Sequence, residues 1–236
     1  MNIEISLEDL LKNGSHFGHN KKRWNPKMDS FIYGEKNGTH IIDLRKTLPL
    51  IESALKFAYE SSKNKKKFLF VSTKKQHSEI VENIAKETNN YFVNFRWLGG
   101  MITNWNTVKN SINTLKNYEN ILNSDDTVFT KKELSDIEKK KIRLDKTLGG
   151  IIEMKSTPDV IFIIDTNREH IAVLEAKKLG IPIIGIVDTN CDPDLIDHPI
   201  PANDDGVKSV QFILDNFKKV LISNDNSSLE ESTKNE

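Results

Sequence analysis

Residues 158–187, PDVIFIIDTNREHIAVLEAKKLGIPIIGIV, carry the clearest structural pattern in this chain. Two runs of apolar, mostly β-branched residues, 160–165 and 181–187, predict buried strands. The segment between them repeats apolar residues at helical spacing: Ile171, Leu174 and Leu179. Gly180 follows as a helix stop signal. A strand, a helix and a second strand in this order predict a βαβ unit, because parallel strands need a long crossover connection.

The alternation of apolar runs and helical patterns continues on both sides of this unit. The other segments that predict strands are 68–72 and 91–95, with weaker ones at 31–33 and 39–42. The other segments that predict helices are 48–58, 80–87 and 207–217. Strands that are apolar on both faces and alternate with helices are typical of a parallel sheet covered on both sides. We therefore predict a three-layer α/β/α fold.

One region departs from this alternation, because two narrow apolar stripes follow each other there without a strand. The first stripe contains Trp105, Val108, Ile112, Leu115 and Leu122. The second contains Leu134, Ile137, Leu144, Leu148 and Ile151. Thr130 and Glu133 form a capping box at the start of the second stripe. Matched narrow stripes favour an antiparallel, coiled-coil-like hairpin that projects from the body. The alternative is two amphipathic helices lying flat on the sheet, which usually bury a wider face.

These patterns predict the division of the chain. The α/β body is discontinuous and comprises residues 1–102 and 152–222, and the hairpin insertion comprises 103–151. The segment 223–236 is polar, with Leu229 as its only aliphatic residue. Because such a segment buries too little apolar surface to offset the entropy of ordering, we expect a disordered tail.

Composition limits the function classes. Lys+Arg and Asp+Glu are equal at 34 each, so any nucleic-acid surface must come from the local placement of charge. The lone cysteine, Cys191, cannot form an internal disulfide, which fits a reducing compartment. The first residues lack the basic and apolar regions of a secretory signal, and no segment approaches the ~20 apolar residues of a membrane helix. We expect a soluble, intracellular protein without a membrane partner.

Common enzyme motifs are absent from the sequence. It contains no dinucleotide-binding or Walker glycine loop and no G-x-S-x-G elbow. The glycine pairs at 99–100 and 149–150 bracket the hairpin, and we interpret them as hinges where the chain changes direction. Cys191 follows a strand, but no base is evident that would activate it as a nucleophile. His16 and His19 could share a metal, although hydrogen bonds to backbone or phosphate suit them better without further ligands nearby.

Aspartates gather after the last two predicted strands. Asp165 and Asp188 end these strands, at the edge where open α/β sheets usually bind ligands. The other acidic residues nearby are Asp192, Asp194, Asp197, Asp204 and Asp205. They could hold Mg²⁺, or they could form turns and cap helices, with 203–205 as a helix start. The first alternative would make the protein a magnesium-dependent α/β enzyme or a phospho-receiver.

A basic stretch near the N-terminus favours nucleic acid instead. Residues 10–28 contain no acid but five cations: Lys12, Lys21, Lys22, Arg23 and Lys27. Phe17 and Trp24 are interleaved with them. Cations neutralise phosphates, and an aromatic ring can stack on an unpaired base. The alternative is a solvated basic face with Trp24 packed inward.

A second basic stretch covers residues 88–118, which hold Arg96, Lys109 and Lys116 and no acid. Arg96 stands in the run RWLGG, and the run TNWN follows at 103–106. An arginine, amides and a hydroxyl beside glycines suit contacts with phosphate and sugar. Further lysines at 65–67 and 74–75 are more typical of a solvated face.

Several long runs in register resemble one known family, the bacterial and organellar type of small-subunit ribosomal protein S-two. They are GSHFGH at 14–19, WNPKM at 24–28, FVNFRWLGGMITNW at 92–105, the run PDVIFIIDTNREHIAVLEAKKLGIP at 158–182, IVDTNCDP at 186–193 and IPANDD at 200–205. The resemblance extends in order from about residue 6 to residue 220.

This resemblance implies a flavodoxin-like α/β domain with a protruding helical hairpin, no catalysis and no cofactor. It implies a cytoplasmic ribosome, of a bacterium or an organelle, as the location. The partners it implies are small-subunit ribosomal RNA near the head–body junction and neighbouring ribosomal proteins, including the large one that captures messenger RNA. The residues expected to face RNA are Lys21, Lys22, Arg23, Trp24, Arg96, Trp97, Asn104 and Trp105. Some of these aromatic residues could instead belong to the core.

Overall fold

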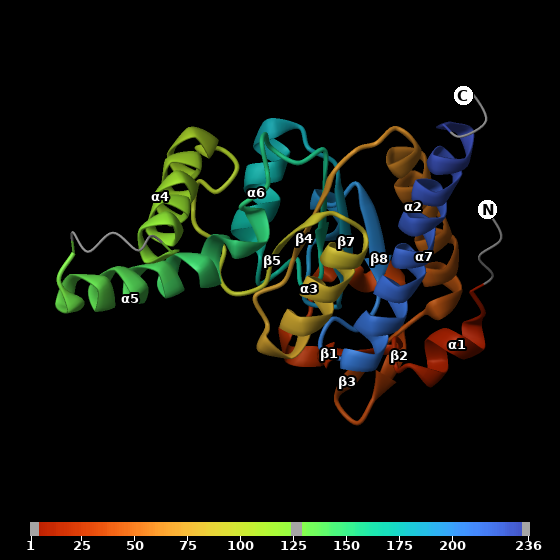
Figure 1. Ribbon diagram of the computed structural model, residues 1–236. Coiled ribbons are helices and arrows are strands. Elements are labelled where there is room, and N and C mark those ends of the chain that lie inside the picture. The colour runs from red at the N-terminus through yellow and green to blue at the C-terminus, as the bar shows by residue number, and fades with distance from the viewer. Residues whose placement is uncertain (1–4, 124–128, 233–236) are drawn as a thin grey trace.

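A five-stranded parallel sheet lies at the centre of the computed structural model, which describes residues 5–123 and 129–232, with side chains as far as residue 223 (Figure 1). Its strands are β4 (Phe68–Val71), β5 (Tyr91–Val93), β6 (Val160–Ile163), β7 (Ile183–Val187) and β8 (His198–Pro201). Their order in the sheet is β5-β4-β6-β7-β8, and every pair is parallel. In chain order this is the 2-1-3-4-5 arrangement of flavodoxin-like folds. The predicted fold class is confirmed.

Two hydrophobic cores lie on the two faces of this sheet. Successive residues of a strand point to opposite faces, so Phe68 and Phe70 enter one core and Leu69 and Val71 enter the other. The helices of the first core are α2 (Leu44–Lys63), α3 (Ser78–Glu87) and α7 (Val207–Ser232). The second core is covered by α6 (His170–Leu179) and by the base of α4 (Trp105–Asn123). These layers confirm the three-layer architecture.

A small antiparallel sheet lies at the carboxyl edge of the large one (Figure 1). It consists of β1 (Phe17–Asn20), β2 (Ile32–Lys36) and β3 (Thr39–Ile42) in the order β1-β3-β2, after the short helix α1 (Leu7–Lys12). The strands β1 and β8 and the helix α1 were not predicted from the sequence. The run FGHN is short and polar, and HPIP contains two prolines, which a strand accepts only at an edge or in a bulge.

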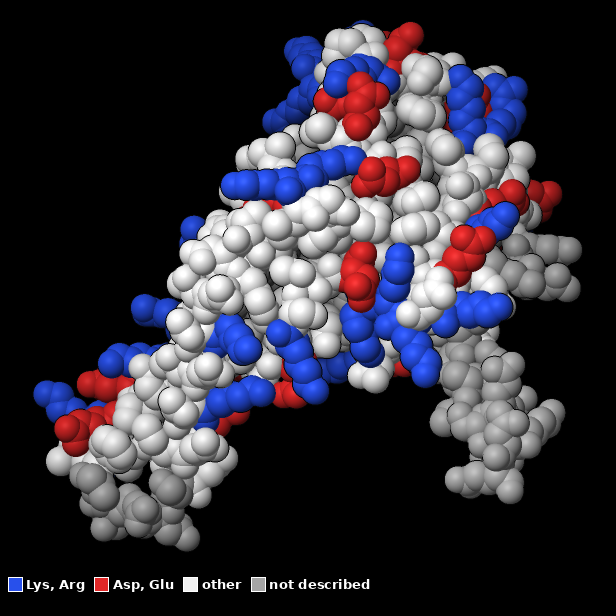
Figure 2. Space-filling model, turned by 90° about the horizontal axis from the view of Figure 1, so that it is seen from above, with Lys and Arg blue, Asp and Glu red and all other residues white. Residues whose placement is uncertain are grey.

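The hairpin consists of α4 and α5 (Lys131–Leu148) and projects from the body (Figures 1 and 2). A capping box of Thr130 and Glu133 begins α5, as expected. The buried residues of the two helices all lie at the base: Val108, Ile112, Leu115 and Leu148. Farther out, Lys141 Nζ lies 3.4 Å from Glu119 Oε1 and joins the helices across the solvent-exposed part. The projecting arrangement, and not the flat one, is therefore the observed one.

Short 3₁₀ helices connect the larger elements. They are η1 (Lys21–Arg23), η2 (Pro26–Phe31), η3 (Lys75–His77), η4 (Gly149–Ile151) and η5 (Pro193–Leu195). Within residues 5–123 and 129–232, no helix is both long enough and apolar enough to cross a membrane. Helix α7 continues to Ser232, so the tail expected at 223–236 overlaps its last turns, and residues 233–236 lie outside the described part.

Candidate nucleic-acid interface and the adjoining charged cluster

Charged side chains meet where four strands of the large sheet end. Lys74 follows β4, Asp165 follows β6, Asp188 follows β7 and Asp204 follows β8. Because the carboxyl ends of parallel strands share one edge, residues up to 130 positions apart in the sequence come into contact here. The strand β1 adds His19 from the small sheet. We call these five residues, together with Asp205, the edge cluster.

Lys74 is the centre of the edge cluster. Its Nζ lies 2.7 Å from Asp165 Oδ2, 2.9 Å from Asp204 Oδ1 and 2.8 Å from Asp205 Oδ1. Burial by itself would lower the pKa of Lys74, but these carboxylates outweigh it and raise the pKa above the ordinary value. The sequence analysis assigned Lys74 to a solvated basic run. Its position at the end of a buried strand was the signal that pointed to another role.

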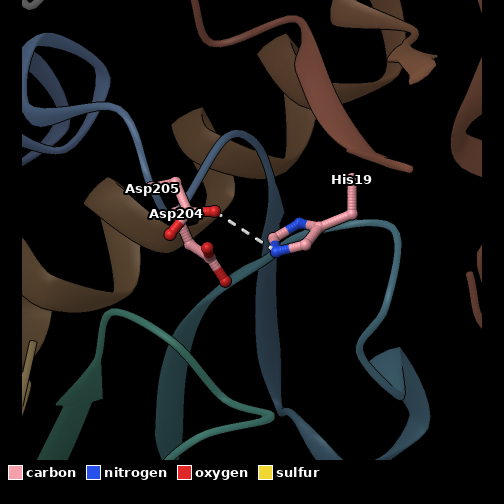
Figure 3. A group of neighbouring side chains, drawn as sticks. All are labelled: His19, Asp204 and Asp205. Carbon is pink, nitrogen blue, oxygen red and sulfur yellow. Dashed lines mark ion pairs between the residues drawn. The ribbon is translucent and has the colours of Figure 1, made fainter. Parts of the chain in front are cut away.

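His19 links the two sheets through the same carboxylates. Its Nδ1 lies 3.0 Å from Asp188 Oδ2, and its Nε2 lies 3.3 Å from Asp205 Oδ2. Figure 3 shows the ring turned toward Asp204 and Asp205. The hydrogen bond with Asp188 exceeds the opposing effect of burial and raises the pKa of His19 to about 9. At neutral pH His19 is therefore a second cation among the aspartates.

Asp204 is fully buried between Lys74 and the other aspartates of the edge cluster. Burial and the neighbouring Asp165 and Asp188 raise the pKa of Asp204 above its ordinary value, although Lys74 opposes this shift. Within the described residues, its Oδ2 has no hydrogen-bond partner. The ion pair with Lys74, whose Nζ lies 2.9 Å from Asp204 Oδ1, offsets part of the cost of burying this side chain.

Two sets of side chains in the cluster have ligand atoms close enough to share a metal ion. One is His19, Asp204 and Asp205, and the other is Asp165, Cys191 and Asp204, each with all atoms within 4.8 Å of one another. Burial raises the pKa of Cys191 to about 12, so its thiol stays protonated and is a weak ligand. The ammonium of Lys74 already contacts three of the carboxylates. The cluster therefore carries its own cations.

Other polar residues after the strands cap helices, as one of the two interpretations predicted. Asn203 Oδ1 accepts hydrogen bonds from the backbone N–H groups of Asp205 and Gly206, both at 2.9 Å, just before α7. Asp192 Oδ1 accepts from the N–H of Asp194 at 3.1 Å and begins η5.

The N-terminal basic residues lie on η1, outside the edge cluster. Lys22 and Arg23 are exposed, and neither forms an ion pair within the described part of the chain. Lys21 differs, because its Nζ lies 2.9 Å from Glu35 Oε1. Trp24 is 37% exposed and stacks on His40 with ring centroids 5.4 Å apart. Its ring is thus accessible and not packed inward.

The second set of expected RNA-facing residues divides into surface and core. Arg96 and Asn104 are exposed, whereas Trp105 is half-buried against the second core. Trp97 is only 7% exposed, and its Nε1 donates to Glu175 Oε1 at 3.1 Å. Trp97 is therefore a core residue that supports the backbone beside Arg96, and its ring is not free to stack on a base.

The two basic stretches lie at the same carboxyl edge of the sheet but next to different strands. The N–H of Asn25 donates to the carbonyl of Thr189 at 2.7 Å, so the segment around η1 lies beside the end of β7. Arg96 follows β5, which lies at the other end of the strand order from β7 and β8. It is nevertheless at the same carboxyl edge of the sheet. On the face seen in Figure 2, Lys and Arg side chains lie along the hairpin and over the body with acidic residues between them.

Comparison with known proteins identifies the family. Residues 10–223 match the family model described as "Ribosomal protein S2". The chain is 56% identical to the small ribosomal subunit protein uS2 of Wolbachia pipientis subsp. Culex pipiens (strain wPip), covering 89% of this chain and 78% of that protein. It is 50% identical to the protein of the same name from Rhizobium rhizogenes, covering 93% of this chain and 86% of that one.

The chain belongs to the ribosomal protein S2 family. Members of the S2 family are structural, non-enzymatic proteins, so the magnesium-dependent enzyme and the phospho-receiver are no longer supported. In this member, four of the aspartates considered for those activities contact Lys74 or His19: Asp165, Asp188, Asp204 and Asp205.

A residue of this S2 protein that the sequence analysis did not single out is Glu175 on α6. Its buried carboxylate accepts hydrogen bonds from the N–H groups of Gly100, Ile102 and Thr103, from the Thr103 hydroxyl and from the Trp97 ring, at 2.7–3.1 Å. It therefore holds the turn that leads into the hairpin. Its helical position, on the buried side of α6, was the available signal, but the pattern could not show what it faces.

Proposed function

We propose that this chain is a structural protein of the small ribosomal subunit that binds its RNA through the exposed cations Lys22, Arg23 and Arg96. The observation that carries the proposal is the family match over nearly the whole chain, to relatives named as small-subunit proteins. Its location is accordingly the ribosome in the cytoplasm.

The proposed RNA contacts rest on charge that remains unneutralised at the surface. Lys22 and Arg23 extend from a short 3₁₀ helix next to the accessible ring of Trp24. A cation on each side of a backbone phosphate strengthens binding, and the aromatic ring can also stack on an unpaired base. Lys21 contributes less, because Glu35 already neutralises it. Among the residues of the second stretch, Arg96 and Asn104 are the surface contacts, and Trp97 and Trp105 support them.

RNA near the junction of the head and body of the subunit, and neighbouring ribosomal proteins, are the partners that we propose. The large protein that captures messenger RNA is the specific neighbour. An apolar groove of about 350 Å³ beside α1 supports a protein contact, with Leu7, Leu11 and Tyr33 in its lining. Glu8, Asp43 and Arg45 also line it. Asp43 and Arg45 pair with each other at 2.9 Å, so Glu8 leaves a net negative charge that disfavours a phosphate there.

Sedimentation of a tagged chain with the small subunit tests the proposal. We expect comigration in low salt and weaker retention in moderate salt, because each phosphate contact releases counterions. The double variant Lys22→Glu/Arg23→Glu should reduce incorporation. The double variant Lys63→Glu/Lys66→Glu, at exposed sites on the amino edge, serves as the matched control and should not.

A free monomer peak in both salts, with small subunits assembled normally in cells that lack the protein, would refute the ribosomal role. Equal incorporation of the two double variants would refute only the RNA contact at η1. For the groove, Leu11→Ser should weaken binding of the purified messenger-capturing protein, whereas Leu179→Ser, at another exposed leucine, should not.

A further inference from the structure

A pocket of about 480 Å³ lies beside the edge cluster, at the ends of three adjacent strands, and the N–H of its lining residue Arg168 donates to Asp165 Oδ1 at 2.8 Å. Its lining is Thr73, Phe95, Arg96, Trp97, Arg168, Glu169 and Ile171. Thr73 follows β4, Phe95 follows β5 and Arg168 follows β6. In the sheet order β5-β4-β6, the strand that follows β4 in the chain, β5, lies on one side of β4. The next strand in the chain, β6, lies on the other side.

That position is the topological switch point of the sheet. Helix α3, after β4, covers the first core, and α6, after β6, covers the second. Adjacent connections that leave toward opposite faces open a crevice at the carboxyl ends of the strands, where ligands of α/β proteins usually bind. The volume also falls in the range of small-ligand sites, roughly 300–1,000 Å³.

The pocket presents two arginines, of which Arg168 has one long ion pair, with Glu169. Arg168 is exposed and is held through one nitrogen, since its Nε donates to Thr73 Oγ1 at 2.9 Å. The carboxylate of Glu169 is 3.9 Å from this Nε but is committed to Thr73, accepting from its N–H at 2.8 Å and from its hydroxyl at 2.5 Å. Within the described residues, no ion pair involves Arg96.

Apolar side chains complete the pocket. Phe95 is 56% exposed and Ile171 is 43% exposed, although both are large and apolar. The floor is rigid, because Trp97 is buried and bound to Glu175. An accessible aromatic ring beside two guanidinium groups is suited to a ligand that is flat at one end and anionic at the other.

We propose that this pocket receives one unpaired nucleotide of the small-subunit RNA, with its base against Phe95 and its phosphate between Arg96 and Arg168. The proposal rests on the RNA-binding function proposed above and adds Phe95, Arg168 and Ile171 to the interface. The N–H donors of an arginine guanidinium fit the geometry of phosphate oxygens, and stacking of a base on an aromatic ring does not depend on base identity. An acidic peptide would use the arginines but would leave the ring and Ile171 without a partner.

The surface offers a matched control for this chemistry. The guanidinium of Arg45, at the start of α2, lies over the ring of the 69% exposed Tyr33 on β2, 5.4 Å from its centroid. This pair combines an aromatic ring and an arginine outside the pocket. Phe95→Leu and Arg168→Gln are therefore compared with Tyr33→Leu and Arg45→Gln in the full chain.

Binding of purified small-subunit RNA is measured as a function of salt, together with chemical modification of unpaired bases. Phe95→Leu should weaken binding roughly 5- to 100-fold, the effect of one stacked base. Arg168→Gln should reduce the salt slope by about one phosphate contact, and Arg168→Lys should restore the slope but not the full affinity. One unpaired base should be protected with the wild type and with Tyr33→Leu, and lose protection with Phe95→Leu.

The outcomes separate the two proposals. If the wild type does not bind the RNA, the RNA-binding function itself fails. If it binds and the pocket variants equal their controls in affinity, slope and protection, the pocket proposal is wrong and the function stands. If the pocket variants keep RNA but lose a neighbouring ribosomal protein, the occupant is a protein. If adenosine monophosphate fills the pocket while RNA binding is unchanged, the site serves a free nucleotide.

Discussion

At the scale of single residues, buried charge is balanced by specific partners. Glu175 is 8% exposed and accepts five hydrogen bonds. Burial would raise its pKa, but the donors at Trp97, Thr103, Gly100 and Ile102 outweigh burial and lower the pKa. A buried carboxylate with this many donors stabilises the fold only while all of them remain satisfied.

Replacement of Glu175 by glutamine should therefore destabilise the protein. The amide NH₂ of Gln cannot accept, so at least one backbone N–H would face another donor. We expect the free energy of unfolding in urea to fall by about 3 kcal/mol. Glu153→Gln, at an exposed glutamate with an ion pair to Lys116, should change it by less than about 1 kcal/mol. Equal effects of the two substitutions would contradict the role of Glu175.

His19 predicts a dependence of stability on pH. Its pKa is about 9 in the folded chain and 6.5 in the absence of interactions. A raised pKa stabilises the fold fully below pH 6.5, and the contribution declines as pH rises and is lost above about pH 9. His19→Gln should thus lower the free energy of unfolding by roughly 2 kcal/mol at pH 6 and by little at pH 9.5. The exposed His170, changed to Gln, is the control, and a pH-independent loss at His19 would disprove the linkage.

At the scale of elements, the two glycine pairs differ in their roles. We interpreted both as hinges. Gly100 has φ +85 and makes the turn before α4. Gly150 is needed for close packing, because a Cβ there would lie 2.1 Å from the carbonyl oxygen of Phe92 on β5. The end of the hairpin thus covers the edge strand β5, which protects that edge from pairing with another chain.

Gly150→Ala should force the base of the hairpin away from β5. We expect a loss of about 3 kcal/mol in the free energy of unfolding, since backbone and not a flexible side chain occupies the space. At Gly99, a Cβ would meet nothing within 4 Å, so Gly99→Ala should change stability by about 0.5 kcal/mol or less. Thermal or urea unfolding distinguishes the two, and a neutral Gly150→Ala would mean that the contact can relax.

At the scale of the whole molecule, the base of the hairpin packs into the body, whereas its outer part is exposed to solvent. Val108, Ile112 and Leu115 enter the second core with Leu148, whereas the outer residues are mostly exposed. The neutral total charge agrees with this arrangement, because contact with RNA needs only local unpaired cations. The division of the chain at 103 and 151 remains a prediction.

Trimming the hairpin tests this separation. Replacing residues 120–140 by a short glycine–serine turn keeps the Glu119–Lys141 pair and every buried residue of the base. We expect the free energy of unfolding to change by less than about 1 kcal/mol. Ile112→Ala, at the base, should lower it by about 3 kcal/mol. If trimming costs as much as Ile112→Ala, the outer hairpin is part of the cooperative unit.

The fold class could be predicted from local patterns, because apolar runs and helical periodicities report directly which faces are buried. Four strands of the parallel sheet, the helices that cover it and the hairpin were predicted in this way, whereas the short helix α1 was not. The strands β1 and β8 were missed, since four-residue segments with polar residues or prolines are stabilised by their neighbours and not by their own composition.

The candidate site was only partly predictable. The sequence alone determined that cations and aromatic residues are concentrated at 10–28 and 88–118. Only the tertiary structure decided that Trp97 is buried, that Lys74 and His19 neutralise the aspartates, and that Arg96 and Arg168 share a pocket. The physical reason is distance along the chain. The contact between residues 73 and 168 depends on how parallel strands assemble at one edge, and the contact between residues 19 and 205 depends on how the small antiparallel sheet packs there. No local pattern encodes either proximity.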